Sequence, residues 1–449
     1  MGIATIRELQ VLLRGHGVTT AYVKKLATKQ DNDKNQIYLG AGLDSVTNLF
    51  PATISVRAPS ESTAKPGSRA GQPKMEAALR FAWLDPGGNR HVAPGARIID
   101  YFQYPEIRFS GFLKGCEGAP DALRRRLQAG FGQRWLVMGN APDGTVLGVV
   151  LTERDDPLAS NFPELPALAG SGVLLVLTVD EEAGREPRDL VNEEIGRIVA
   201  GGWHSSVIMK ATGIVPFRGA QGAGYTLEAL LGVTANAEKA PDRHGFEIKS
   251  YSGSRISLMT PTPDRGYQGE RTFREFMERF GQPAVNGDGS RRFVGLFRAG
   301  GHNEKHGLSM RVAGYDQVAD RFSGHAGEIA VELFDPVTGD IAAGWSLERL
   351  ANSWNRKHAS ALYIRAEKNP APAGDGQDEY RYLTPWLVGE GTDVWRLLRA
   401  IAAGYVFYDP ADTIYADGRS KVRSQWRVNS STLKSTMDRL YARVSETGG

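Results

Sequence analysis

The fold and chemistry of this chain are decided by the stretch Pro241-Asp242-Arg243-His244-Gly245-Phe246-Glu247-Ile248-Lys249-Ser250. Glu247 and Lys249 stand one residue apart in a run that alternates between apolar and polar side chains. Residues i and i+2 of a strand point to the same face, so we expect this carboxylate and this ammonium side by side. Asp242 precedes Gly245, and a turn there would return its carboxylate to the same point.

Two carboxylates and a lysine in one place suit the hydrolysis of phosphodiesters. Carboxylate oxygens are the ligands that Mg²⁺ prefers, and this ion also binds phosphate oxygens. A lysine beside them can orient or help deprotonate the attacking water and can stabilise charge on the phosphate. The pattern therefore predicts a nuclease centre. An exposed ion pair between Glu247 and Lys249 is the alternative that these residues alone leave open.

Three flanking segments add to this prediction. Upstream, Gly222–Gly232 predicts a short helix with leucines on its buried side, which ends at the last glycine. Glu228 lies in that helix among apolar neighbours, where a carboxylate is costly unless it is paired or coordinated. Downstream are the segment Thr260-Pro261-Thr262-Pro263 and, near the C-terminus, the basic run Lys421-Val422-Arg423-Ser424-Gln425-Trp426-Arg427-Val428.

Taken together, these segments resemble the MvaI/BcnI family of restriction endonucleases, which are relatives of the mismatch-repair nickase MutH among the PD-(D/E)xK nucleases. The resemblance rests on four features in the family's order: the helix with Gly-Tyr-Thr-Leu-Glu, Pro-Asp with Glu-x-Lys, Thr-Pro-x-Pro, and the basic run. It covers about residues 196 to 449. It implies a restriction-endonuclease-like, MutH-like fold for this part of the chain.

The resemblance also implies a role for each residue of the site. Asp242 and Glu247 match the metal-binding carboxylates, and the backbone carbonyl of Ile248 would be a further ligand of the Mg²⁺ ion. Lys249 matches the catalytic lysine, and Glu228 matches the helix glutamate that supports the metal site.

The function that the resemblance implies is that of a type II restriction enzyme. Such an enzyme cuts double-stranded DNA with Mg²⁺, leaving a 5′-phosphate and a 3′-hydroxyl, and acts as a monomer with one active site. A cognate DNA methyltransferase would be encoded nearby, without a stable complex. Two alternatives stay open: a related nickase or effector nuclease of phage defence or repair, and a non-catalytic DNA-binding protein.

The basic run is the candidate for sequence recognition. Lys421, Arg423, Gln425 and Arg427 alternate along an expected strand, which would place all four on one face. Arginine can donate two hydrogen bonds to guanine, and glutamine can pair with adenine. The alternative is a face that follows phosphates without reading bases. The resemblance favours base reading by Arg423 or Arg427.

Composition and length predict two domains of mixed α/β class. The chain has 449 residues, 41% hydrophobic and 23% charged, with a net charge of +3, which is long for one core. An acidic stretch at 180–189 is the expected linker between an accessory domain, 1–187, and the nuclease domain, 188–449. One cysteine excludes an internal disulfide, and no apolar run is long enough to span a membrane. We expect a soluble, cytoplasmic protein.

The first 187 residues show no convergent catalytic set. A helix is expected at Ile6–Leu13, followed by a second helix from Thr19 or Thr20 to Leu26 that carries Lys24 and Lys25. The pair would be either a helix-turn-helix or a plain helical hairpin. Strands are expected at 79–84, 135–138, 146–151 and 173–179. With the polar cluster Lys34–Gln36, these features predict an accessory domain that binds DNA or selects targets.

Overall fold

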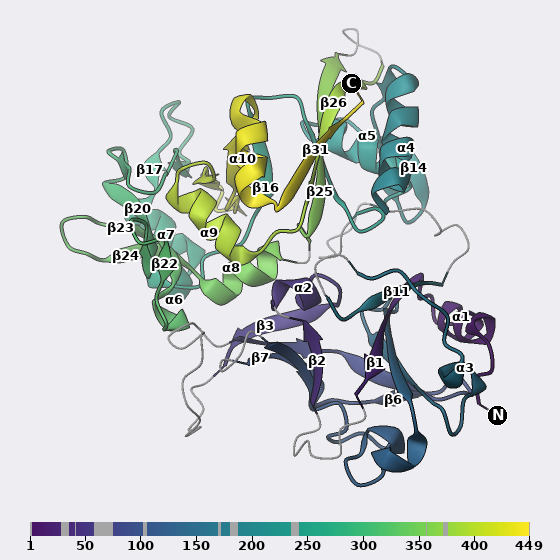
Figure 1. Ribbon diagram of the computed structural model, residues 1–449. Helices are drawn as coiled ribbons and strands as arrows, with labels where there is room; N and C mark the ends of the chain where they lie inside the picture. Colours follow the sequence, from purple (N-terminus) through teal and green to yellow (C-terminus); the bar gives the residue numbers. More distant parts are fainter. Residues whose placement is uncertain are drawn as a thin grey trace. The chain divides into compact units, whose positions relative to one another are not determined.

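The computed structural model describes residues 2–27, 36–40, 42–57, 75–101, 106–168, 172–179, 187–234, 242–355, 357–370 and 376–448. The chain divides into two compact units, Met1–Glu186 and Pro187–Gly449 (Figure 1). Each unit is a mixture of helices and strands. Among the described residues, no helix is long and apolar enough to cross a membrane.

The first unit is built mainly from two sheets. One has the order β11 (Leu175–Thr178), β1 (Thr20–Leu26), β9 (Arg134–Asn140), β10 (Val146–Thr152), β5 (Phe81–Leu84), β6 (Arg90–Val92). The other has the order β2 (Gln36–Gly40), β8 (Glu106–Ser110), β7 (Arg97–Tyr101), β4 (Met75–Leu79), β3 (Ala52–Val56). Among its described residues, the α-helices are α1 (Ile6–Arg14), α2 (Asp44–Thr47) and α3 (Pro157–Ser160).

The predicted helix over Thr20–Leu26 is wrong, because this segment is strand β1. Its buried residues alternate at Ala21 and Val23, the period of a strand, and it pairs with both β9 and β11. A helix-turn-helix is therefore excluded here. Lys24 and Lys25 instead lie over the rings of Tyr38 and Trp135, at 5.6 and 5.5 Å.

Most of the other elements predicted for this unit are present in the structure. Helix α1 and strands β9, β10 and β11 confirm the predicted helix and three of the predicted strands. The fourth, 79–84, is split by Arg80 between β4 and β5. Of the polar cluster, Lys34 and Asn35 lie outside the described residues, as does the stretch 180–186 of the expected linker.

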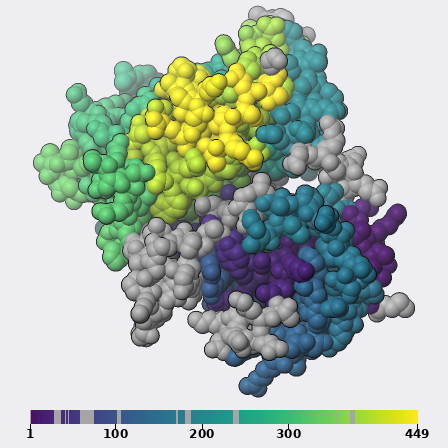
Figure 2. Space-filling model, in the orientation of Figure 1, coloured from purple at the N-terminus to yellow at the C-terminus, as the bar shows by residue number. Residues whose placement is uncertain are grey.

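The centre of the second unit is a sheet of five strands. Its order is β12 (His204–Ser205), β26 (Glu379–Glu390), β25 (Ser360–Asn369), β15 (Glu247–Tyr251), and β31 (Arg443–Thr447) also pairs with β26. Helices α4 (Pro187–Ala200) and α5 (Gly222–Leu230) pack their apolar side chains against this sheet (Figure 1). The C-terminal residues, in yellow, lie on one face of the unit (Figure 2).

The rest of this unit consists of smaller sheets and helices. One sheet is β16 (Arg255–Met259), β30 (Trp426–Asn429), β27 (Phe407–Tyr408), and a second is β17 (Gln282–Pro283), β18 (Arg291–Val294), β28 (Ala411–Ile414), β29 (Ser420–Lys421). A third is β19 (His302–Asn303), β20 (Leu308–Ala313), β23 (Ala330–Phe334), β24 (Ile341–Ser346); β13 (Val207–Lys210) pairs with β14 (Gly213–Pro216), and β21 (Tyr315–Asp316) with β22 (Arg321–Phe322). The remaining α-helices are α6 (Gly266–Glu270), α7 (Phe273–Phe280), α8 (Leu347–Trp354), α9 (Val394–Ala402) and α10 (Leu433–Leu440).

The basic run is not the single strand that its alternation predicts. Lys421 belongs to β29, while Arg427 belongs to β30 in a different sheet. Between them the chain is fixed by two side chains. Ser424 is buried and its hydroxyl donates to the carbonyl of Pro261 at 2.5 Å, and the carboxylate of Asp412 accepts the backbone N–H of Arg423 at 2.6 Å.

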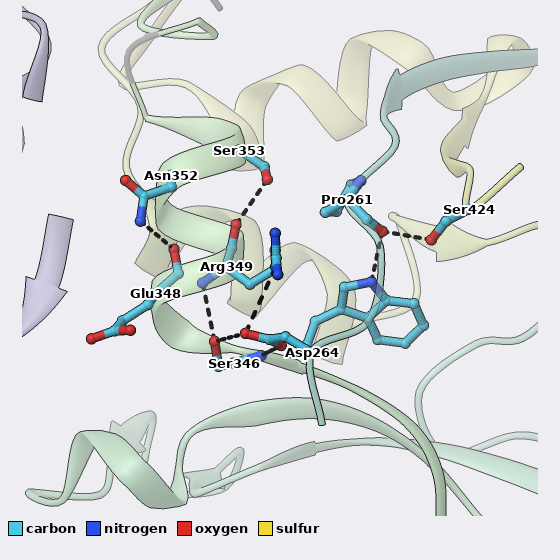
Figure 3. Close-up of polar contacts among 9 residues, drawn as sticks. Pro261, Asp264, Ser346, Glu348, Arg349, Asn352, Ser353 and Ser424 are labelled. Atoms are coloured by element: carbon cyan, nitrogen blue, oxygen red, sulfur yellow. Dashed lines mark hydrogen bonds and ion pairs between the residues drawn. The ribbon is translucent and has the colours of Figure 1, made fainter. Parts of the chain in front are cut away.

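The Thr-Pro-Thr-Pro segment holds several of these elements together (Figure 3). The carbonyl of Pro261 accepts a second hydrogen bond, of 2.8 Å, from the indole of Trp345. Asp264, directly after the segment, accepts from the backbone N–H and the hydroxyl of Ser346 at 2.8 and 2.6 Å. Because the Ser346 hydroxyl also caps helix α8, this segment fixes α8 and the basic run in one framework.

Candidate active site and DNA-recognition pocket

Asp242 reaches the start of β15 because the chain turns tightly after it. His244 and Gly245 form a two-residue loop with φ angles of 48° and 81°, and the residues on either side exchange backbone hydrogen bonds of 3.1 and 2.7 Å. Two consecutive positive φ angles are typical of a type I′ turn. After this turn, Asp242 Oδ2 accepts the backbone N–H of Ile248 at 2.8 Å.

Glu247 and Lys249 meet on one face of β15. Glu247 is only 1% exposed, and its Oε1 pairs with Lys249 Nζ. Strand β15 lies at the edge of the central sheet and pairs in parallel with β25. The structure thus brings together the carboxylate and the ammonium of the Glu-x-Lys motif.

A second lysine, which the sequence pattern did not reveal, also contacts this carboxylate. Lys357 Nζ lies 3.5 Å from Glu247 Oε2. It stands shortly before β25, whose parallel pairing with β15 brings the start of both strands together. In the sequence, only the basic residues around Lys357 suggested a role for it. The pairing of β15 with β25 could not be deduced, because it joins segments more than 100 residues apart.

Helix α5 approaches the central sheet closely. A Cβ atom on Gly222 would lie 2.5 Å from the hydroxyl of Tyr380, so glycine is required at this point. At the next residue, the carbonyl of Ala223 accepts a hydrogen bond of 2.7 Å from the hydroxyl of Tyr382. These contacts fix the helix that carries Glu228.

Glu228 belongs electrostatically to the same cluster. Burial and the negative charge of Asp242 raise the pKa of Glu228 to about 7, with a further contribution from Glu247 and an opposing one from Lys249. The negative charges of Asp242 and Glu247 therefore oppose the ionisation of Glu228. The structure brings together Glu228, Asp242, Glu247 and Lys249, the four residues that the sequence selected.

Burial and mutual attraction both act on the ion pair at the centre of the site. Burial raises the pKa of Glu247, although Lys249 counteracts this effect. Burial acts to lower the pKa of Lys249, but the carboxylate of Glu247 outweighs it and holds that pKa above its usual range. His358 is buried nearby, and burial together with the two lysines lowers its pKa well below the usual value, so the positive charge at this site comes from Lys249 and Lys357.

The chemistry of this cluster fits a divalent cation. Glu247 Oε2 is buried and accepts no hydrogen bond from any described residue, and burial, with a contribution from the charge of Asp242, raises the pKa of both Glu228 and Glu247. Within the described part of the chain, no three His, Cys, Asp or Glu side chains form a metal-binding group. A cation here would thus have two carboxylates, Asp242 and Glu247, with backbone oxygen and water completing its shell.

The turn that carries Asp242 is anchored to helix α4. Glu194 on this helix accepts two hydrogen bonds from the guanidinium of Arg243, at 2.6 and 3.0 Å. The Nε2 atom of His244 lies 3.2 Å from the same carboxylate. Both residues that follow Asp242 are therefore held by one side chain of α4.

Part of the basic run lines a pocket of about 460 Å³. Its residues are Arg255, Val294, Gly295, Leu296, Asp409, Pro410, Ala411, Arg423, Gln425 and Arg427. The structure thus gathers three of the four predicted recognition residues. Lys421 is not among the lining residues and is exposed on β29.

Arg255 and Asp409 are members of this pocket that the sequence pattern did not single out. Arg255 begins β16, which pairs with β30 of the basic run. Asp409 follows β27, which pairs with β30 on its other side. Neither pairing was predicted from the sequence: β16 is distant from β30 in the chain, and β27 is only two residues long.

Comparison with known proteins identifies the family of this chain. The model of the MvaI/BcnI restriction endonuclease family matches residues 192–437, more than half of the chain. A solved complex of the restriction endonuclease MvaI with its cognate DNA substrate shares 20% identity, covering 59% of this chain and 99% of that chain, with a TM-score of 0.44. MvaI without DNA also shares 20% identity, with coverages of 59% and 98% and a TM-score of 0.33. No curated protein sequence matches.

The family model spans helix α5, the turn at Asp242, the Glu-x-Lys strand and the basic run, so it covers every residue of the candidate site and of the recognition pocket. The resemblance read from the sequence motifs is confirmed by this match. The chain belongs to the MvaI/BcnI restriction endonuclease family, and it is a type II site-specific deoxyribonuclease.

Proposed function

We propose that the second unit hydrolyses phosphodiester bonds of double-stranded DNA with Mg²⁺, leaving a 5′-phosphate and a 3′-hydroxyl. The observation that carries this proposal is the cluster of Glu228, Asp242 and Glu247 around Lys249, in which a buried carboxylate oxygen lacks a hydrogen bond. Asp242, Glu247 and the carbonyl of Ile248 would hold the ion. When bound, Mg²⁺ supplies charge that polarises the phosphate and lowers the pKa of water.

The two lysines have different parts in this proposal. Since the carboxylate of Glu247 keeps the pKa of Lys249 high, its ammonium is a donor and not a base at neutral pH. It orients the attacking water and donates to a phosphate oxygen as negative charge develops. Lys357 adds a second positive charge on the other oxygen of the same carboxylate. Glu228 maintains the negative potential that attracts the cation.

The test is cleavage of unmethylated plasmid DNA with Mg²⁺, followed by sequencing of the fragment ends. We expect ends at one recurrent sequence, with 5′-phosphates that a ligase can join directly. Ends at random positions, or 3′-phosphates, would contradict the proposal. Nicked plasmid as the final product would favour the alternative of a DNA nickase.

We further propose that the basic run reads bases through Arg427, which lines the pocket, while Lys421 contacts only phosphates. Arg427→Ala should lower affinity by about 1–3 kcal/mol and relax the preference at one base pair. Lys421→Ala, the matched control, should weaken binding to every sequence equally and lower the slope of log K against log salt by about 0.9. Affinity, base preference and salt slope are all measured by titrating each protein with a duplex that contains the recognition sequence and with its single-base variants, at several salt concentrations. Equal weakening by both variants would leave Arg427 without a role in reading.

For the first unit we propose an accessory role in DNA binding. The loop between β8 and β9 forms a pocket of about 630 Å³ lined by Lys114, Arg124, Arg125 and Arg126, with Phe112, Leu113 and Leu127 as apolar neighbours. Buried Arg134 holds this loop, because its guanidinium donates to the carbonyl of Ala122 at 2.7 Å and to Oε1 of Gln128 at 3.0 Å. A rigid cluster of cations suits the phosphates of a duplex.

Arg126→Gln should therefore lower the affinity of the full chain for DNA. One lost phosphate contact reduces the salt slope by about 0.9, without changing the sequence that is cut. Arg7→Gln, on the exposed side of α1, is the matched control and should change neither. The two affinities are compared by fluorescence anisotropy at several salt concentrations. If Arg126→Gln binds as tightly as the control, the pocket does not contact DNA.

A further inference from the structure

One buried carboxylate in the recognition pocket holds two arginines. Asp409 is 7% exposed, and its Oδ2 accepts from Arg255 Nη1 at 2.9 Å and from Arg427 Nη1 at 3.0 Å. Arg427 is fixed a second time, because its Nε donates to the hydroxyl of Ser257 at 3.1 Å. The two guanidiniums thus converge on a single oxygen atom.

The backbone explains how these side chains meet. Strand β30 lies between β16 and β27, and Ser257 on β16 is the register partner of Arg427. On the other side, Tyr408, directly before Asp409, is the register partner of Trp426. The two arginines therefore lie on adjacent strands, and the carboxylate directly follows the third strand, so their relative positions do not depend on a long loop.

Each arginine keeps donors available after these bonds are made. A guanidinium has five N–H donors, and neither Nη2 atom has a hydrogen-bond partner among the residues that the structure describes. The side chains of Arg255 and Arg427 are 42% and 24% exposed, and both line the pocket. Without Asp409, two like charges this close would repel each other and the side chains would separate.

We propose that Asp409 is a positioning residue for sequence recognition, which keeps Arg255 and Arg427 together in the pocket so that both donate to base edges of one duplex. Arg255 is then a second base-contacting arginine. The proposal rests on base reading by Arg427. The ligand chemistry is a pair of adjacent acceptors, such as O6 and N7 of guanine, which accept two N–H groups of a guanidinium.

A simpler role for the carboxylate predicts the opposite result. If Asp409 only neutralised the arginines, its removal would free two positive charges and tighten binding to all DNA sequences. If it positions them, its removal frees the side chains to move, and selectivity falls while binding to random DNA does not weaken. Measuring the selectivity of Asp409 variants therefore distinguishes positioning from charge neutralisation, which measuring affinity alone would not do.

The test uses full-length protein and a library of duplexes of about 20 base pairs with a randomised core, bound with Ca²⁺ in place of Mg²⁺. Sequencing of the bound fraction gives the preference at each position. We expect Asp409→Asn to lower the preference for the best sequence over its single-base variants by about tenfold, within the range that one bidentate contact provides. The amide is neutral, so the one oxygen that both arginines share attracts them more weakly and no longer compensates their like charges.

Two comparisons isolate the charge of the carboxylate. Asp409→Glu and Asp409→Gln have side chains of nearly the same size and disturb packing similarly, but only the glutamate carries the negative charge that compensates both guanidiniums. We expect Asp409→Glu to retain more of the selectivity. Asp417→Asn, which removes the carboxylate of the exposed Asp417–Arg419 pair, controls for a change in net charge and should leave selectivity unchanged.

The effect of Asp409→Asn should also disappear once its partners are absent. In the Arg255→Ala/Arg427→Ala background, adding Asp409→Asn should cause no further loss of selectivity. Unchanged selectivity in Asp409→Asn, or equal behaviour of the Glu and Gln variants, would overturn the proposal. If Arg427→Ala alone leaves selectivity intact, base reading by this pocket fails as well. Neither result bears on the cleavage chemistry, since Ca²⁺ replaces Mg²⁺.

Discussion

Lys249→Ala will abolish cleavage of plasmid DNA and leave DNA binding intact. In the proposed mechanism the ammonium donates where negative charge would develop on the phosphate, and loss of one such donor raises the barrier by on the order of 3 kcal/mol or more, at least about a hundredfold in rate. Affinity should change little, because Lys249 is mostly buried beside Glu247. The measurement is the initial rate of supercoil loss with Mg²⁺, together with duplex affinity with Ca²⁺.

Three variants complete this experiment. Asp242→Ala and Glu247→Ala should be equally inactive, since each removes a carboxylate that would hold the ion. Lys357→Ala should be impaired less than Lys249→Ala, because its contact with Glu247 is longer and more exposed. The unfolding temperature of each variant shows whether the fold is retained. Full activity of a folded Lys249→Ala protein would refute the assigned role.

Glu228→Gln will stabilise the metal-free protein at alkaline pH. The pKa of Glu228 is raised to about 7 from 4.5, by burial first and then by Asp242. A carboxyl with a raised pKa in the folded state contributes stability that is complete below about 4.5 and is lost as the pH rises through about 7. The glutamine stays neutral, so at pH 8.5 it should be more stable than the native protein by on the order of 2 kcal/mol.

The measurement is thermal unfolding of both proteins between about pH 4.5 and pH 8.5 in EDTA. Their curves should coincide at the acid end and diverge as the pH rises. Added Mg²⁺ should reduce the difference at pH 8.5, since a bound cation compensates the repulsion among the carboxylates. If the two proteins differed in stability by the same amount at every pH, ionisation of Glu228 would not be opposed by the neighbouring carboxylates.

Local patterns in the sequence predicted the short-range geometry of the site well. Alternation placed Glu247 and Lys249 on one face, and Gly245 indicated the turn that returns Asp242, because both signals depend only on neighbouring residues. The same reasoning failed at β1, where Thr19 and Thr20 resemble helix caps. There the pairing with two other strands decided the structure, and strand propensity is dominated by such tertiary context.

Contacts between distant segments could not be predicted. Lys357 reaches Glu247 through the pairing of β15 with β25, and Asp409 meets two arginines through the sheet formed by β16, β30 and β27. The basic run was predicted to be one strand because polar side chains occupy every second position in it. Its course is instead set by Ser424, which is held by the carbonyl of Pro261, more than 160 residues earlier.

The contact between Glu194 and the turn limits how this protein can be recombined with others. Helix α4 begins the second unit at Pro187, and through Arg243 and His244 it holds the loop on which Asp242 stands. A different module could thus be fused in place of the first unit only if the joint lies before Pro187. A joint within α4 would preserve every proposed catalytic side chain, but we expect it to misalign the carboxylate of Asp242. The boundary of the nuclease module is therefore set by a helix that contains none of its proposed catalytic residues.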